Sequence, residues 1–121
     1  MTETGFNFAH YGELRDVNAT DGELAVFTAL RSILADAGLD QSKLQLVRKS
    51  DSYVSAVIPC HHDKWGDYEA DIARFKWTDR AKWITIPMNG TKKNKIASFA
   101  DVWQFRDDIV RAYNHDIANA K

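Results

Sequence analysis

The chain contains few of the residues that cross-link a small domain or end its helices and strands. Its 121 residues include one cysteine, two prolines and six glycines. A single cysteine cannot form a disulfide within the chain, so the fold must rest on its hydrophobic core, and a reducing compartment is favoured. Pro59 and Pro87 each follow an isoleucine at the close of an apolar run. Because proline cannot donate to a strand ladder, we expect both to end strands.

Long apolar segments are also missing. The uninterrupted apolar runs are only a few residues long, far below the roughly 20 that a membrane-spanning helix needs. The first residues show no basic segment followed by an apolar one, as a secretory signal would. We therefore expect a soluble, cytoplasmic protein with no membrane partner.

The charge that is present is unevenly distributed, although the net charge is only −1. Residues 1–42 carry two basic and seven acidic side chains, and residues 98–121 carry three and four. Residues 43–97 carry eleven basic and six acidic side chains. This basic middle either presents a surface to an anionic partner or supplies the solvated side chains of strands between acidic helices.

Helical periodicity occurs near each end of the chain and predicts helices over about 20–37 and 98–117. The first follows Thr20-Asp21-Gly22-Glu23, which has the capping-box pattern, with a hydroxyl and a carboxylate able to satisfy each other's backbone amides. Ser98 and Asp101 stand in a similar relation at the start of the second. Both helices are amphipathic and need an apolar face to cover.

Four strands are predicted between the helices, over residues 44–49, 53–58, 70–77 and 82–87, with short turns joining the members of each pair. The polar segment 88–97 is expected to be a loop. The order α-β-β-β-β-α predicts an α+β fold, with an antiparallel sheet of four or five strands and both helices packed on one of its faces.

The domain organisation that follows is simple. We expect residues 1–19 to form an N-terminal arm packed on the body, and residues 20–121 to form a single α+β domain. The arm contains Phe6, Phe8 and Tyr11. These aromatics either cover the face of the sheet that the helices leave open or leave that face exposed.

That open face is the predicted binding surface. Pairing Trp77 with Lys82 puts Phe75 and Ile84 together on the core side and turns the residues between them outward. The predicted surface is aromatic and basic; its residues are Tyr53, Ile72, Arg74, Lys76, Lys82, Trp83, Lys92, Lys93 and Lys95. Such a surface favours a protein partner or self-association, and single-stranded nucleic acid is an alternative.

The other candidate site is Cys60-His61-His62-Asp63, which follows the apolar run and is predicted to begin a loop. Cys60 and His62 are two residues apart, so they could bind zinc together with Asp67, Glu69 or, as the favoured third ligand, His115. Alternatively, the thiolate of Cys60 could act as a nucleophile. The sequence lacks the paired ligand doublets of known zinc frameworks. The leading prediction is therefore a binding domain without a cofactor rather than an enzyme, with a metal protein or enzyme centred on Cys60, His61 and His62 as the alternative.

Overall fold

A computed structural model of the protein describes residues 18–121, so the predicted arm over residues 1–19 lies almost wholly outside the described residues. Its main elements are helix α1 (Asp21–Asp36), strands β1 (Gln45–Ser50), β2 (Tyr53–His62), β3 (Gly66–Trp77) and β4 (Lys82–Thr85), the 3₁₀ helix η2 (Pro87–Asn89), strand β5 (Asn94–Lys95), the 3₁₀ helix η3 (Phe99–Phe105) and helix α2 (Arg106–Ile117).

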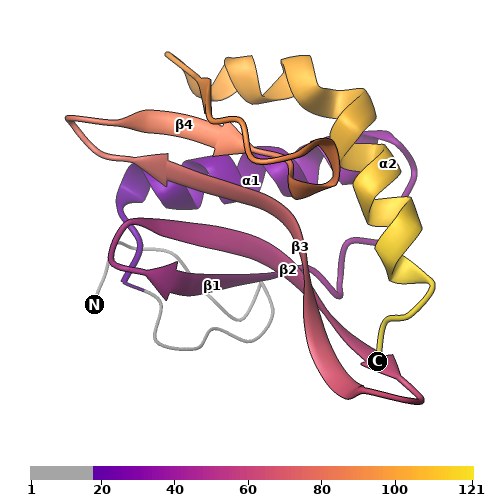
Figure 1. The fold of residues 1–121 in the computed structure, drawn as a ribbon. Coiled ribbons are helices and arrows are strands. Elements are labelled where there is room, and N and C mark those ends of the chain that lie inside the picture. The colour runs from indigo at the N-terminus through magenta and orange to yellow at the C-terminus, as the bar shows by residue number, and fades with distance from the viewer. Residues whose placement is uncertain (1–17) are drawn as a thin grey trace.

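The sheet is a five-stranded antiparallel meander in the order β1-β2-β3-β4-β5, and both helices pack on one of its faces (Figure 1). The predicted α+β fold is confirmed. One continuous core lies between the layers, with members from α1, α2 and every strand except the short β5; its largest fully buried members include Phe27, Leu30, Phe75, Ile84 and Tyr113. No helix within residues 18–121 is long and apolar enough to cross a membrane.

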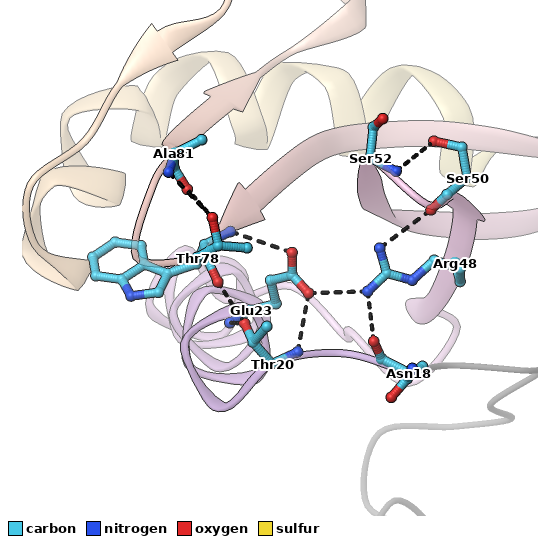
Figure 2. A network of polar contacts seen from close by, with 9 residues as sticks. Asn18, Thr20, Glu23, Arg48, Ser50, Ser52, Thr78 and Ala81 are labelled. Atoms are coloured by element: carbon cyan, nitrogen blue, oxygen red, sulfur yellow. Dashed lines mark hydrogen bonds and ion pairs between the residues drawn. The ribbon is translucent and has the colours of Figure 1, made fainter.

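The start of α1 is tied to two strands by the buried carboxylate of Glu23, which is 1% exposed (Figure 2). The predicted capping box is present: Thr20 Oγ1 accepts from the Glu23 amide, and Glu23 Oε1 accepts from the Thr20 amide, both at 3.0 Å. Oε1 also accepts from Arg48 of β1 at 3.1 Å, and Oε2 accepts from the Trp77 amide at the end of β3 at 3.2 Å. The network therefore holds the end of β3 against the helix.

The predicted helix over 98–117 is helical throughout, but its first half is the 3₁₀ helix η3 and only Arg106–Ile117 is α-helical. Phe99, Val102 and Phe105 recur every three residues, which is the repeat of a 3₁₀ helix. Of these, Val102 is fully buried. The capping role of Asp101 is present, because its carboxylate accepts from the Ser98 amide at 3.0 Å.

The prediction that Pro59 ends a strand is wrong, since β2 continues to His62. The Pro59 carbonyl accepts from the Lys121 amide at 3.0 Å, on the side of β2 away from β3. The N and O atoms of a strand residue point to the same side, so the missing N–H of Pro59 also faces away from β3. Pairing of Pro59 with Glu69 of β3 is therefore undisturbed.

A bulge in β3 corrects the predicted position of Ile72. Ala56 pairs with Ala73 while Val57 pairs with Asp71, so Ile72 is an extra residue in the ladder. At a bulge the alternation of side chains changes phase. Ile72 is therefore 1% exposed and belongs to the core, not to the outward surface where strict alternation placed it.

Candidate functional site

The face of the sheet opposite the helices carries a row of four side chains that crosses four strands. Lys76 of β3 pairs with Trp83 of β4, and Trp83 pairs with Lys95 of β5. Val54 pairs with Phe75, so the preceding residue of β2, Tyr53, lies opposite Lys76. Directly opposed residues of neighbouring strands project from the same face. The row is thus aromatic, lysine, aromatic, lysine; we call it the cross-strand row.

The row faces away from the helices because its sequence neighbours face toward them. Val54, Phe75 and Ile84 are fully buried members of the core, and side chains alternate along a strand. Tyr53, Lys76 and Trp83 are partly exposed and Lys95 is exposed. The outward orientation predicted for this part of the sheet agrees with this pattern.

The two aromatic rings of the row lie close together, each with a cation nearby. The ring centroids of Tyr53 and Trp83 are 6.0 Å apart and their planes are inclined by 51°. The Arg74 guanidinium carbon is 6.0 Å from the centre of the Tyr53 ring, and Lys93 Nζ is 4.8 Å from that of Trp83. These are cation–π distances, worth roughly 0.5–1 kcal/mol each at exposed sites. We call the row together with Arg74 and Lys93 the aromatic–basic face.

The cations of this face differ in their partners. Arg74 is held by Asp71, whose Oδ2 accepts from Nε at 3.1 Å and from a terminal nitrogen at 2.7 Å. The hydrogen bonds that Arg74 donates to Asp71 are the main cause that raises the pKa of Arg74. By contrast, Lys76, Lys93 and Lys95 form no ion pair with any other residue in the range 18–121.

A hollow of about 620 Å³ adjoins the row at the β4–β5 edge. Trp83, Lys93 and Lys95 line one part of it, so the hollow continues the aromatic–basic face. Its remaining lining is Asp79, Arg80, Ala81, Lys82, Ile96, Ala97 and Asp101. Four basic side chains against two acidic ones give the hollow a positive balance.

Lys82 and Lys92 of the predicted surface lie outside the row. Lys82 pairs with Trp77, one position from the row, and its Nζ lies 4.8 Å from the centre of the Trp77 ring, so it borders the hollow from the helix side of the sheet. Lys92 is exposed in the turn before β5, where its carbonyl accepts from Thr85 Oγ1 at 2.9 Å. The structure therefore brings Tyr53, Arg74, Lys76, Trp83, Lys93 and Lys95 together on one face, whereas Lys82 and Lys92 lie outside the row and Ile72 is in the core.

Sequence reasoning missed Arg80 as part of this region and treated residues 88–97 as a loop. Within that segment Asn94 and Lys95 form β5, and Ile96 is buried. A weak strand signal was present in the sequence. Lys93 and Lys95 are two residues apart and precede the apolar Ile96, as on a strand with one solvent-exposed face. A two-residue strand is too short to be found from this signal alone.

Cys60 does not begin a loop; it lies in β2 and is fully buried. Its Sγ is 3.7 Å from the carbonyl oxygen of Asp116 in α2. Burial is the main cause that raises the pKa of the thiol. A nucleophilic cysteine needs an accessible thiolate, so this environment argues against that role.

The three residues predicted to bind zinc each contact different partners. Cys60 packs in the core, whereas Nδ1 of His62 accepts from the amides of Lys64 and Trp65, and its ring stacks on that of Trp65 at 4.0 Å. His115 contacts its neighbour Asp116 at 3.0 Å. No group of three His, Cys, Asp or Glu side chains within the described chain could hold a metal, and the structure does not bring Cys60, His62 and His115 together.

The side chain of His61 projects from the face of β2 opposite to that of Cys60 and His62. It contacts Asp67, its direct partner in β3, at 2.8 Å. Asp67 also pairs with Lys121 at 3.0 Å. The hydrogen bond from His61 is the first cause that lowers the pKa of Asp67. These contacts secure the far end of the β2–β3 hairpin and leave the aromatic–basic face as the candidate site.

Comparisons with known proteins add no second line of argument. No protein-family profile, no curated protein and no solved structure matches the chain.

Proposed function

We propose that this protein is a binding domain and that its aromatic–basic face is the docking surface for a negatively charged partner. The observation that carries the proposal is the cross-strand row, in which Tyr53, Lys76, Trp83 and Lys95 alternate ring and cation over four strands. Three lysines of the face have no ion-pair partner among residues 18–121. A negatively charged partner would provide ion-pair partners for these lysines.

An apolar partner fits this face less well than the sequence alone indicates. Ile72 is in the core, and Val47 and Val57, which project from the same face as the row, are 4% and 0% exposed. The apolar surface that remains is mainly the two rings, and each already lies near a cation. A protein partner, as predicted from the sequence, would therefore need to be acidic where it meets the row.

Self-association through the row is disfavoured by charge. A two-fold dimer presents the same patch on both subunits, so Lys76, Lys93 and Lys95 of one copy would face the lysines of the other. Like charges brought together at an interface are repulsive. The self-association prediction is thus the weaker of the two partner predictions made from the sequence.

Heparin-affinity chromatography with a salt gradient tests the proposal with a generic polyanion. The wild-type protein should be retained in spite of its net charge of −1, and Lys95→Glu should elute at lower salt, because a favourable contact becomes repulsive. Lys64→Glu is the matched control: Lys64 is also exposed and without an ion pair in residues 18–121, but it lies in the β2–β3 turn, away from β4 and β5 (Figure 1).

Elution of Lys95→Glu together with Lys64→Glu would contradict the proposal, since retention would then follow total charge and not the face. Absence of retention in the wild type would do the same. If the wild type also sediments as a dimer that Trp83→Ala converts to monomer, the face is a self-association surface instead.

A further inference from the structure

We infer that the partner of the aromatic–basic face is single-stranded nucleic acid. This inference rests on the proposed function and names its ligand class. Proteins that bind single strands without sequence preference combine a cationic surface that follows the phosphates with aromatic side chains on which bases stack. The cross-strand row supplies both kinds of group at regular spacing.

The spacing suits separate bases. The Tyr53 and Trp83 planes are inclined by 51°, so the two rings cannot hold one base between parallel faces, and each base would stack on one ring beside the cation that lies near it, Arg74 or Lys93. Lys76 lies between them in the ladder, and Lys95 follows Trp83. Three inter-strand spacings of about 4.8 Å give the row a length of roughly 14 Å. A strand crossing the sheet would thus place a phosphate beside a lysine after each stacked base.

The hollow beyond Trp83 extends this path. Its volume of about 620 Å³ lies within the range of about 300–1,000 Å³ that is usual for small-ligand sites, so a nucleotide can enter it. Ala81 and Ala97 offer apolar surface for a base, while Arg80, Lys93 and Lys95 offer cations for the phosphate. Trp83 borders both the row and the hollow and is the central residue of the path.

A duplex and an acidic peptide fit less well. The rings can contribute only if base faces are accessible, and a duplex keeps its bases paired and stacked. The row lies on the sheet itself, so its rings and lysines are not carried by a helix that could enter a major groove. An acidic peptide would satisfy the lysines, but its carboxylates carry no ring that could stack on Tyr53 and Trp83.

Fluorescence anisotropy with labelled oligomers of about ten units tests the inference, a length within the site sizes of single-strand binders. The probes are oligo-dT, oligo-U, a mixed-sequence DNA duplex and oligoglutamate. We expect both single strands to bind more tightly than the duplex and the peptide; the relative affinity of oligo-dT and oligo-U shows whether DNA or RNA is preferred. Contact with three lysines predicts a slope of log K against log salt near −2.

Variants locate the site. Trp83→Ala should weaken single-strand binding by roughly 5- to 150-fold, the loss expected for one stacked base. Trp65→Ala, at a tryptophan that is 75% exposed in the β2–β3 turn, is the matched control and should leave the affinity unchanged. Lys95→Glu should lower both the affinity and the salt slope, and it tests the site at an exposed position should Trp83→Ala fail to fold.

The outcomes separate the two proposals. Retention on heparin without single-strand binding would overturn the inference and leave the anionic docking surface standing. Oligoglutamate or duplex bound as tightly as oligo-dT, or Trp83→Ala and Trp65→Ala of equal effect, would also overturn it. Failure to bind heparin and every labelled probe would overturn both.

Discussion

Truncation of Glu23 to alanine should be among the most damaging single substitutions in this protein. The carboxylate is 1% exposed and accepts hydrogen bonds from two backbone amides and one guanidinium (Figure 2). In Glu23→Ala the amides of Thr20 and Trp77 lose these acceptors, and Arg48, whose side chain is only 19% exposed, loses its ion-pair partner.

The magnitude follows from these three donors. A buried donor left without a partner costs about 1–3 kcal/mol, and removing one member of a buried ion pair costs about 3–5 kcal/mol. The terms overlap, and Arg48 can regain some water, so we expect Glu23→Ala to lower the free energy of unfolding by about 3–5 kcal/mol. Domains of this kind are typically stable by about 5–15 kcal/mol, so the loss is a large share of the total.

Urea denaturation followed by circular dichroism measures the effect, with the m-value as a check that the transition remains two-state. Asp21→Ala is the matched control, because Asp21 is an acidic residue of the same helical turn but is exposed. It should cost only about 0.3–1 kcal/mol, the value of a favourable helix-dipole contact. In an Arg48→Ala background Glu23→Ala should cost less, since the pair is already broken. A Glu23→Ala loss no larger than that of Asp21→Ala would refute the reasoning.

Two further substitutions test packing and burial. Gly22→Ala should lower the free energy of unfolding by about 1–3 kcal/mol in spite of alanine's higher helix propensity, because the new Cβ would lie 1.8 Å from Cδ1 of Trp77. A rise in the melting temperature would contradict this. Tyr113 is buried and donates to the Asp40 carbonyl, and burial raises its pKa above the ordinary value of 10.0. Its neutral form thus stabilises the fold below about pH 10, and this contribution is lost as pH rises through the folded-state pKa. Tyr113→Phe should show a shallower alkaline loss of stability in urea titrations above pH 10; an unchanged slope would exclude this role.

The fold was predictable from the sequence because its signals are local. The capping box at Thr20 and Glu23 marked α1, and alternation along β3 and β4 gave the pairing of Phe75 with Ile84 that the structure shows. Lys76 opposite Trp83 followed from the same register, so half of the cross-strand row was predictable.

What escaped prediction depends on contacts between distant segments. Proline usually ends a strand, and this rule predicted the end of β2 at Pro59. The strand continues because the carboxyl-terminal residues bond to its other side, where the Lys121 amide donates to the Pro59 carbonyl. Lys95 enters the row only through a two-residue strand. Cys60 and His62 look like a ligand pair by spacing, but the partner of the cysteine sulfur is the Asp116 carbonyl, a contact that no spacing rule gives.

The bulge at Ile72 explains why the proposed docking surface lies at one end of the sheet. Before it, β3 turns Asp67, Glu69 and Asp71 to the face opposite the helices; after it, Arg74 and Lys76 occupy the same face. Without the phase change, strict alternation from the buried Phe75 would turn these three carboxylates toward the core, where burial of a charge is costly.

The two halves of this face also differ in how far their charges are already satisfied. The acidic half is paired internally: Lys49 lies 3.3 Å from both Glu69 and Asp71, and Asp67 contacts Lys121. The lysines of the row have no such partner within residues 18–121. An anionic polymer laid along β3 would meet the carboxylates beyond the bulge, whereas one laid across β2 to β5 meets only the row and the positively balanced hollow. The bulge thus favours a path across the strands, the direction in which rings and lysines alternate.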